Sequence, residues 1–479
     1  MAGSFTAATK NQKTIEDRVP MTQIEAAIAA YVNFMWGLPL VILLVGGGFF
    51  FMLHSRLRHF RYFRHSFDLL RGKFNDDSDS IGGDISHFLA LATALAGTMG
   101  LGNITGVAVA LTVGGPGAIF WMWVTAIVGI STKFYTATLA IMYRGMDDAG
   151  RLQGGPMYII REGLAKKWLP LAWLFAAAGM VGTLPVFQVN QLVQIIRDTV
   201  AIPNGLTAAD SHFNFDLILG IVLAVIAFSI TVGNVKRVSA VAGKMVPAMV
   251  IFYFAVTAVL LVSHIEQVPS MLLLIVTDAF SGQAVSGGVI GTVILIGVQR
   301  GAFSNEAGIG TESLAHGAAK TNEPAREGLV AMVGPIADTL IVCTCTALTL
   351  LVTGVWKGGA QGVTMAAEAY EQVFPGFGAY LLLLMVFVLS MTTVLTYWYY
   401  GSKCMGFLFG AHREKYYLWA YMLLIVAGSV VSLDIVINLL DGAYATMAIP
   451  TMVSTLLLAP KVKAVAMNYF ARLDAGEFD

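Results

Sequence analysis

Residues Gln299 to Gly310 read QRGAFSNEAGIG and interrupt an otherwise apolar part of the chain. The apolar run TVILIGV precedes them, whereas the interruption carries Arg300, Glu306 and three glycines. Inside a bilayer every backbone amide needs a partner, so unwound backbone survives only where it is buried in protein or lines a cavity. Charged side chains at that depth are costly and usually functional. The stretch therefore predicts half of a solute- and ion-binding site in the middle of a membrane.

The composition indicates an all-α polytopic membrane protein. Of the 479 residues, 57% are hydrophobic and 12% are charged, and the mean hydropathy is +0.73. Soluble domains are about one quarter charged. The net charge is zero, which argues against nucleic acid as a partner and leaves the lipid bilayer as the expected one. The three cysteines lie in apolar segments and form neither a disulfide framework nor a zinc pattern.

Apolar runs of about twenty residues are long enough to span a bilayer as helices. Eleven such runs are predicted, at 32–53, 85–113, 117–142, 170–197, 214–233, 240–263, 284–318, 327–353, 378–402, 416–433 and 441–459. Two of them are long and interrupted: 85–113 by AGTMGLGNITG, and 284–318 by the opening stretch. If the first run is set aside, the other ten form two sets of five with the interruption at the same place.

Lysine and arginine gather in alternate connections between these runs, beginning with RLRHFRYFRHSF near residue 56. Because basic connections stay in the cytoplasm, this pattern predicts an N-terminus outside and a C-terminus in the cytoplasm. The two sets of five then have opposite topology, and interruptions at matching places in inverted halves indicate a secondary transporter's site. The predicted parts are an N-terminal tail (1–31), an extra helix with its basic connection (32–84), two repeats (85–263 and 264–460) and a cytoplasmic tail (461–479).

The first interruption, Ala96 to Gly106, has the chemistry of a binding site. Its four glycines let the backbone leave helical geometry at low cost. The exposed amides of a half-helix N-terminus suit an anionic group, and the carbonyls of a C-terminus suit a cation. A glycine-rich face for helix packing is the alternative, but Thr98 and Asn103 within the run favour the site. A zwitterionic amino acid together with Na⁺ fits such a site.

Several segments carry a resemblance to a known family. They are GLGNITGVA (100–108), GGPGAIFWMWVTAIVG (114–129), RGAFSNEAGIG (300–310) and DTLIVCTCTAL (338–348). Together they resemble the alanine/glycine:cation symporters, the sodium:alanine symporter family, over about residues 85–410. The resemblance implies a leucine-transporter-type fold of five plus five inverted helices, preceded by one extra helix. It also implies import of small neutral amino acids, chiefly alanine and glycine, coupled to Na⁺ or sometimes H⁺. We expect the protein to be a monomer in a bacterial cytoplasmic membrane.

The resemblance also implies which residues bind. Amides of Leu101 and Gly102 would receive the substrate carboxylate. The carbonyls of Ala96 and Met99 and the hydroxyls of Thr392 and Thr393 would bind Na⁺. The remaining substrate-binding residues would be Thr98, Asn103, Phe187, Gln188, Gly301, Phe303, Ser304, Asn305 and Tyr397.

Some positions depart from the common family pattern or carry charges that need a partner. Thr396-Tyr397 stands where Gly-Trp is common, which bears on the restriction to alanine and glycine. Lys133 lies inside an apolar run, and we expect it either to pair with Glu312 or to extend to the membrane surface. Arg300 and Glu306 are candidates for an ion pair across the unwound turn. The histidines of RLRHFRYFRHSF are expected on a solvated face.

Other classes of function fit the sequence less well. HExxH, GxSxG and phosphate-loop motifs are absent from the sequence, so an enzyme is not expected. A passive channel would need a repeated filter or a ring of charges. Proton coupling stays open, because Asp338, Glu306 or Glu312 could carry a proton; for Asp338 a purely structural contact is the alternative.

Overall fold

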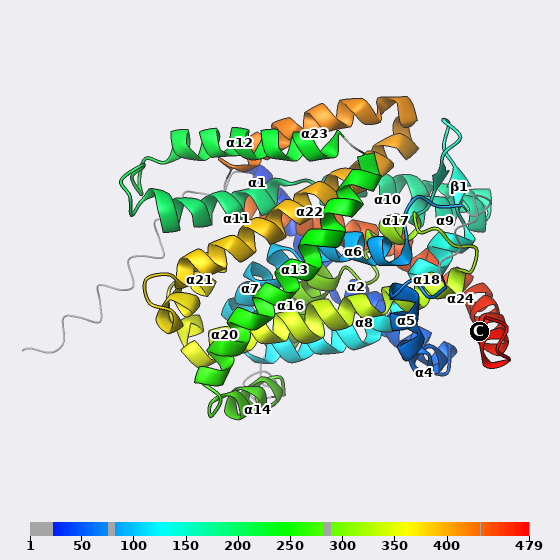
Figure 1. The fold of residues 1–479 in the computed structure, drawn as a ribbon, viewed down its shortest axis with the longest axis horizontal. Coiled ribbons are helices and arrows are strands. Elements are labelled where there is room, and N and C mark those ends of the chain that lie inside the picture. The colour runs from blue at the N-terminus through cyan, green and yellow to red at the C-terminus, as the bar shows by residue number, and fades with distance from the viewer. Residues whose placement is uncertain (1–22, 75–81, 233, 281–288, 432, 479) are drawn as a thin grey trace, which may run out of the picture.

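The chain folds into a bundle of long helices that run roughly along one common direction (Figure 1). The computed structural model describes residues 23–74, 82–232, 234–280, 289–431 and 433–478. The first half contains α1 (Gln23–Met35), α2 (Leu38–Val41), α3 (Gly47–His54), α4 (Arg58–Arg61), α5 (Phe63–Leu70), α6 (His87–Thr98), α7 (Thr105–Gly114), α8 (Gly117–Met142), β1 (Gly145–Met146), β2 (Leu152–Gln153), α9 (Pro156–Gly163), α10 (Leu169–Gly182), α11 (Val186–Ile196) and α12 (Phe213–Thr231).

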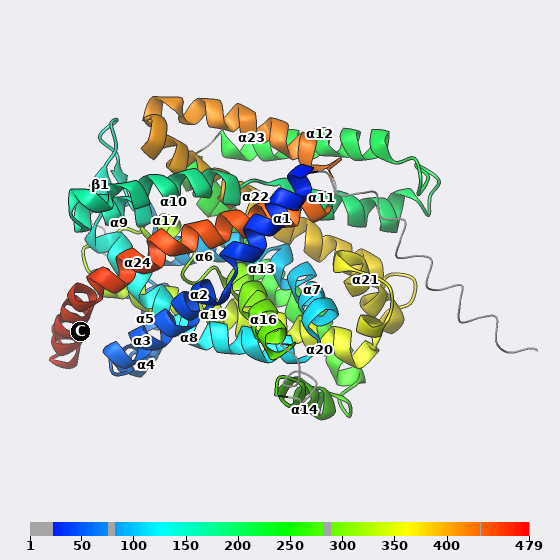
Figure 2. The ribbon, with the colours of Figure 1, turned by 180° about the vertical axis from the view of Figure 1, so that it is seen from behind.

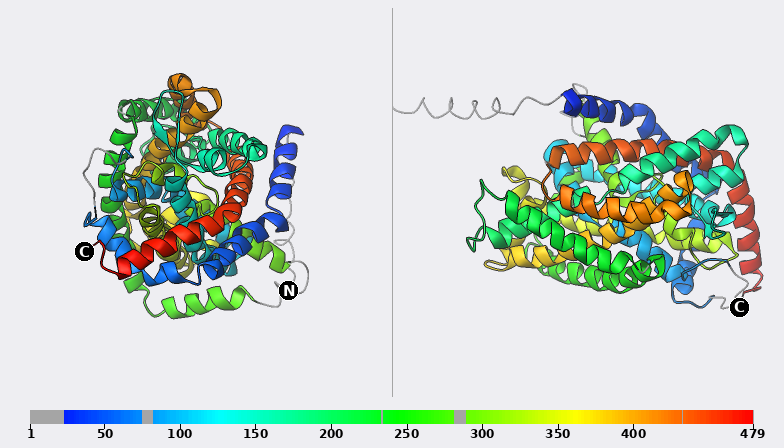
Figure 3. Two further views of the ribbon diagram at one scale, coloured as in Figure 1. Left: turned by 90° about the vertical axis from the view of Figure 1, so that its right-hand side faces the viewer. Right: turned by 90° about the horizontal axis from the view of Figure 1, so that it is seen from above.

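The second half of the chain is also helical. Its helices are α13 (Asn234–Ser263), α14 (Val268–Asp278), α16 (Val289–Asn305), α17 (Glu312–His316), α18 (Pro324–Ala331), α19 (Val333–Pro335), α20 (Thr344–Thr353), α21 (Gly362–Val373), α22 (Gly378–Phe409), α23 (Glu414–Gly428) and α24 (Leu433–Asp474). A π-helical segment, Ile336–Cys343, joins α19 to α20. Helix α1 lies on the outside of the bundle against α24 (Figures 2 and 3).

Most of the predicted spans are present as helices of spanning length. Within the described residues, seven helices are long and apolar enough to cross a membrane, or nine if each of two bent pairs is one span. The other two predicted runs correspond to shorter helices: α16, of 17 residues, with α17, and α23, of 15 residues. The count of eleven, the inverted repeat and the domain boundaries therefore stay predictions. Residues 1–22 of the predicted tail and 284–288 of the seventh run lie outside the described residues.

Some elements were not expected from the sequence. A short antiparallel hairpin, β1–β2, follows α8, and α14 and α21 are additional helices in connections between predicted spans. Helix α24 does not end near residue 459 but continues to Asp474, through most of the predicted cytoplasmic tail.

Both predicted helix breaks are present. Helices α6 and α7 are bent by 58° about the turn Leu101–Asn103. In the second break α16 stays helical through Asn305, so the unwound part is residues 306–311, later than the centre of the predicted stretch. Glu306, Gly308 and Gly310 have positive φ angles of 54°, 85° and 99° there. This geometry is easy for glycine but unusual for glutamate, whose side chain must be held by its surroundings.

Helix α16 reaches the centre of the bundle because small residues let it approach α8 closely. A Cβ atom added at Gly297 would lie 2.6 Å from the Ala118 carbonyl oxygen and 2.5 Å from the Trp121 Cβ. One at Gly301 would lie 3.1 Å from the Thr125 Cβ. These contacts fix the depth at which the second broken helix carries its functional side chains.

Replacing Gly297 by alanine tests this contact. We expect Gly297→Ala to destabilise the protein by about 1–3 kcal/mol, because backbone and not a flexible side chain opposes the new methyl group. Thermal unfolding of the purified protein in detergent measures the change. Gly291→Ala in the same helix is the matched control, since a Cβ there meets nothing within 4 Å. Equal losses in both variants would contradict the close packing.

One histidine of the basic connection is buried, contrary to the expected solvated face. His59 is 0% exposed, and its Nε2 lies 2.8 Å from the Ser131 hydroxyl of α8. The prediction is wrong for this residue because α4 turns His59 inward against α8, while Arg58 and Arg61 beside it are exposed. Burial lowers the pKa of His59 from its ordinary 6.5 to about 4.

This burial predicts a pH dependence of stability. Between pH 6.5 and about 4 the unfolded chain binds a proton at His59 that the folded protein does not. The contribution of neutral His59 is therefore complete above pH 6.5 and is lost as the pH falls toward about 4. Melting temperatures measured across this range should fall less steeply for His59→Asn than for the wild type. The exposed His412, changed to Gln, serves as the control and should leave the slope unaltered.

Candidate functional site

The Asp338 carboxylate lies where the two broken helices meet. Asp338 is fully buried in the π-helical segment Ile336–Cys343. Its Oδ1 accepts a hydrogen bond from Asn103 Nδ2 at 2.7 Å, and its Oδ2 accepts one from Ser304 Oγ at 2.6 Å. The Thr339 hydroxyl donates a third, at 2.8 Å. Since Asn103 ends the first break and Ser304 precedes the second, Asp338 connects both.

The same cluster contains a buried oxygen that can still accept a hydrogen bond or bind a cation. Among the described residues, the buried Asn103 Oδ1 has no hydrogen-bond partner. A buried acceptor without a donor costs about 1–3 kcal/mol. Ser304 Oγ, Thr339 Oγ1 and the two Asp338 oxygens belong to the same hydrogen-bonded cluster, which Asn103 joins through its Nδ2. This donor set fits a hard cation such as Na⁺, or an ammonium group.

The structure brings some of the residues implied for Na⁺ into contact, but not all of them. Thr393 Oγ1 lies within hydrogen-bond distance of two carbonyls, that of Ala96 at 2.9 Å and that of Leu389 in its own helix at 3.0 Å, so α22 contacts the last turn of α6 as expected. Thr98 and Met99 are buried next to this contact. The Thr392 hydroxyl instead donates to carbonyls of its own helix, those of Val388 and Leu389.

The residues implied for the substrate carboxylate also come together. The Leu101 amide donates to Gln188 Oε1 of α11 at 3.2 Å. A Cβ added at Gly100 would lie 2.6 Å from Thr393 Oγ1, and one at Gly102 would lie 3.2 Å from the Phe303 ring. The first break is therefore enclosed by α11, α16 and α22. Gln188 Oε1 accepts the hydrogen bond of the Leu101 amide, which the family resemblance implies for the substrate carboxylate.

Aromatic side chains border this region. The Phe187 and Phe303 rings meet edge to face at 5.7 Å, and Phe303 lies 5.3 Å from Tyr444. The Tyr397 and Tyr444 hydroxyls donate to Glu306 Oε1 at 2.8 and 2.9 Å. These bonds hold the Glu306 carboxylate and fix both tyrosine rings.

Two remaining residues of the predicted set contact other elements. Asn305 Nδ2 donates to Thr339 Oγ1 at 3.2 Å, which keeps it beside the Asp338 cluster. Gly301 lies within α16 and faces α8, so its backbone is part of a helix interface and not of the unwound turn.

Two expected ion pairs are not formed. Arg300 does not pair with Glu306; it pairs with Asp441 of α24, which also accepts from Gln299 at 2.9 Å. The helix continues past Arg300, so the two charges face different neighbours.

The expected pair of Lys133 with Glu312 is also missing from the ion pairs of the described residues. Glu312 Oε1 accepts a hydrogen bond from Thr136 at 2.9 Å, while the Lys133 ammonium approaches Gly334, in α19. Lys133 is only 2% exposed, so it does not extend to the membrane surface either.

Several residues of the site were missed by sequence reasoning. Asp441 had a usable signal, because it is a carboxylate inside the apolar run 441–459. Thr339 and Tyr444 had none, since hydroxyl and aromatic side chains are common in buried helices. Their roles depend on which helices become neighbours.

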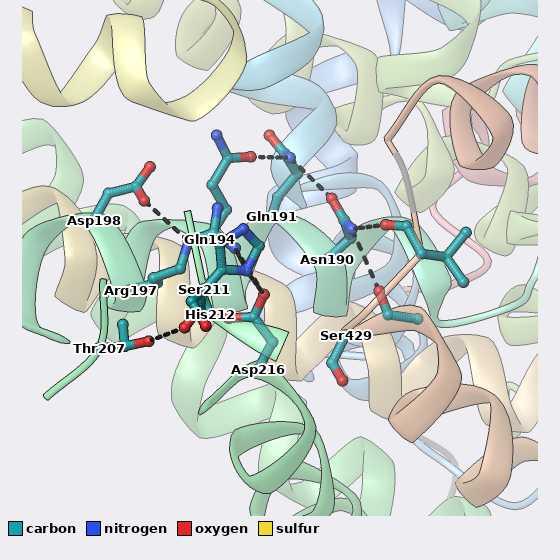
Figure 4. A network of polar contacts seen from close by, with 12 residues as sticks. Asn190, Gln191, Gln194, Arg197, Asp198, Thr207, Ser211, His212, Asp216 and Ser429 are labelled. Atoms are coloured by element: carbon teal, nitrogen blue, oxygen red, sulfur yellow. Dashed lines mark hydrogen bonds and ion pairs between the residues drawn. The ribbon is translucent and has the colours of Figure 1, made fainter. Parts of the chain in front are cut away.

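Polar side chains continue along α11 beyond Gln188. Gln191 Nε2 donates to Gln194 Oε1 at 2.8 Å, and the spacing of three residues keeps these side chains on one face. At the end of the helix Arg197 pairs with Asp216 of α12 at 2.7 Å (Figure 4). The network gives α11 a hydrophilic face that leads from the first break to one end of the bundle.

A family match covers nearly the whole chain. The family model described as "Sodium:alanine symporter family" matches residues 21–479. The chain belongs to the sodium:alanine symporter family. Members are transporters and not enzymes, so this symporter is a multi-pass membrane protein of amino-acid transport.

Relatives and a solved structure support the assignment. The symporter is 39% identical to the sodium/alanine symporter AgcS of Methanococcus maripaludis over 89% of this chain and 93% of the relative. It is 37% identical to an uncharacterized transporter of Haemophilus influenzae over 95% and 98%. Its fold is similar to that of MhsT, solved in complex with L-phenylalanine, with a TM-score of 0.56, 12% identity and coverage of 81% of this chain and 99% of MhsT.

The Arg300–Asp441 pair of the symporter is buried, and removing one partner should be costly. Asp441→Asn leaves a buried guanidinium without its counter-charge, for which we expect a loss of about 3–5 kcal/mol in unfolding free energy. The double variant Arg300→Met/Asp441→Leu should lose clearly less than the sum of its single variants. Glu323→Gln, which breaks the partly exposed pair with Arg472, is the control and should cost about 1 kcal/mol or less. Additive losses in the double variant would contradict a coupled pair.

Proposed function

We propose that this symporter imports a small neutral amino acid, alanine, glycine or a similar one, together with Na⁺ by alternating access. The observation that carries the proposal is the Asp338 carboxylate bonded to Asn103 of the first broken helix and to Ser304 of the second. Broken helices around a central polar cluster are the usual architecture of a secondary transporter's site.

The coupling ion binds at the first break in this proposal. The carbonyls of Ala96 and Met99 and the hydroxyls of Thr392 and Thr393 supply oxygen ligands, and the Ala96–Thr393 contact supports this set. The Asp338 cluster offers a second group of hard oxygens, with the unpartnered Asn103 Oδ1 among them. Oxygen ligands of this kind suit Na⁺ and not softer metals.

The substrate binds beside the ion, its carboxylate on the amides of Leu101 and Gly102. Gln188 Oε1 must then leave the Leu101 amide, where it stands in for the carboxylate. Phe187, Phe303 and Tyr397 border the side-chain space, and Glu306 holds the Tyr397 hydroxyl, so the wall is fixed. A fixed aromatic wall favours small side chains, while the tyrosine in place of tryptophan leaves room for a modified preference.

The proposed setting is a monomer in the bacterial cytoplasmic membrane. The charge pattern supports its orientation, because an N-terminus outside and a C-terminus in the cytoplasm keep the basic connections in the cytoplasm. Proton coupling is a second candidate, which the buried carboxylates Asp338 and Glu306 favour. A passive channel is the weakest alternative.

Uptake into proteoliposomes tests the proposal. The purified chain is reconstituted and supplied with labelled alanine, glycine or a larger neutral amino acid, with an inward Na⁺ gradient, a proton gradient or neither. We expect accumulation of the small amino acids with the Na⁺ gradient alone. Accumulation with only the proton gradient would favour proton coupling, equilibration without a gradient would indicate a channel, and no movement at all would reject amino-acid transport by this chain.

The two threonines predict different changes in Na⁺ dependence. Thr393→Ala removes the hydroxyl that contacts Ala96, a polar interaction worth about 1 kcal/mol, or about fivefold in the Na⁺ concentration for half-maximal uptake. Maximal alanine uptake at saturating Na⁺ should change less. Thr392→Ala should give the smaller shift, because its hydroxyl bonds to its own helix. Equal effects on Na⁺ dependence and on saturated uptake for Thr393→Ala would count against the ion assignment.

A further inference from the structure

A cavity of about 770 Å³ lies beyond the central site, along α22. Its walls are formed by residues just before α6, the end of α12, the start of α13, the second half of α22, the α22–α23 connection, the start of α23, and β2 with the residue before it. Ligand pockets for small molecules have about this volume or less. In the orientation proposed above, the cavity opens toward the cytoplasm.

The charges around the cavity are of both signs. Lys236 lies 3.6 Å from Asp84, and Arg151 lies 2.9 Å from Glu414. Lys403 also lines the cavity, on α22, with its ammonium 5.5 Å from the centre of the Tyr399 ring. The ion pairs of the described residues do not include Lys403. The cavity thus combines Lys403, which has no carboxylate partner among the described residues, with two carboxylates, Asp84 and Glu414, that pair with Lys236 and Arg151.

A residue with a buried, unpartnered donor forms part of the wall of the same cavity. Trp398 lines the cavity, its side chain is only 8% exposed, and within the described residues its Nε1 has no acceptor. A buried indole N–H usually has a hydrogen-bond partner, and leaving it without one is unfavourable. The Nε1 atom itself is covered by protein in this structure, so the indole has to turn toward the cavity before it can share an anionic oxygen with the Lys403 ammonium.

The cavity is connected to the central site by one helix. Tyr397, which borders the substrate space, directly precedes Trp398, and Lys403 follows Thr393 by ten residues. Ten residues of α-helix extend about 15 Å. Along the axis of α22, Trp398 is therefore the nearer and Lys403 the more distant of these two cavity residues from the central site.

We propose that this cavity is a second amino-acid site, which the substrate occupies between the central site and the cytoplasm. Lys403 and Trp398 Nε1 bind the carboxylate, and Asp84 or Glu414 binds the ammonium group. The inference rests on the proposed function, because the zwitterion and the direction of travel come from it.

Transport measured separately from each side tests the proposal. Uptake of labelled alanine into whole cells gives the half-saturation concentration from outside, and inside-out membrane vesicles give it from the cytoplasmic side. Lys403→Gln should raise the cytoplasmic value at least about fivefold, as expected for a lost charge-assisted contact, and the outside value less than about twofold. Lys403→Arg should recover most of the loss. Lys167→Gln, an exposed lysine away from the cavity lining, is the matched control.

Fluorescence gives a readout that does not depend on transport. Titration of the purified chain with alanine in saturating Na⁺ should change the tryptophan emission in two phases, and Trp398→Phe should remove the weaker one. Inorganic phosphate alone should not reproduce that phase; if it does, the cavity is a simple anion site and the proposal is wrong. The proposed second site is also wrong if Lys403→Gln shifts the half-saturation concentration equally on both sides, or on neither side. In that case alanine transport by the wild type still supports the proposed function. A wild type that moves no amino acid would reject the function itself.

Discussion

The buried Asp338 carboxylate is the contact on which the arrangement of the centre depends. A carboxylate removed from water needs several donors, and Asn103, Ser304 and Thr339 supply them from three segments. Neither broken helix could supply this set alone. In a membrane, apolar packing does little to determine which helices associate, because lipid and apolar side chains are equally apolar. Polar hydrogen bonds therefore position the unwound turns.

A second buried carboxylate joins the same helices at one end. Glu327 of α18 lies 2.5 Å from His87 Nδ1 at the start of α6 and 2.6 Å from His316 Nδ1 at the end of α17. Arg144, beyond α8, adds bonds to the carbonyls of Gly82 and Gly317. The broken helices are therefore fixed to each other at two levels, and a rocking motion that keeps both contacts moves them together.

The sequence was informative where one local pattern decides the structure. Glycines and polar residues inside apolar runs identified both breaks, and the contact of Ala96 with Thr393 followed from the family resemblance. Partners distant in sequence were not accessible in this way. Arg300 had a nearby carboxylate in the sequence, Glu306, but a helix that continues through Asn305 turns the two apart and brings Arg300 to Asp441. Such choices depend on which helices are neighbours.

The charges of the stretch Gln299 to Gly310 serve to attach it, and its neutral polar residues serve the site. Arg300 binds α24 through Asp441, and Glu306 binds α22 and α24 through Tyr397 and Tyr444. Ser304 and Asn305 between them face Asp338 and Thr339. Separating α16 from α24 would break the buried Arg300–Asp441 ion pair and would remove the Tyr444 hydroxyl from the Glu306 carboxylate. Together these losses cost several kcal/mol. Helix α24 is therefore expected to follow the second broken helix when the transporter changes state, and the movable unit includes both.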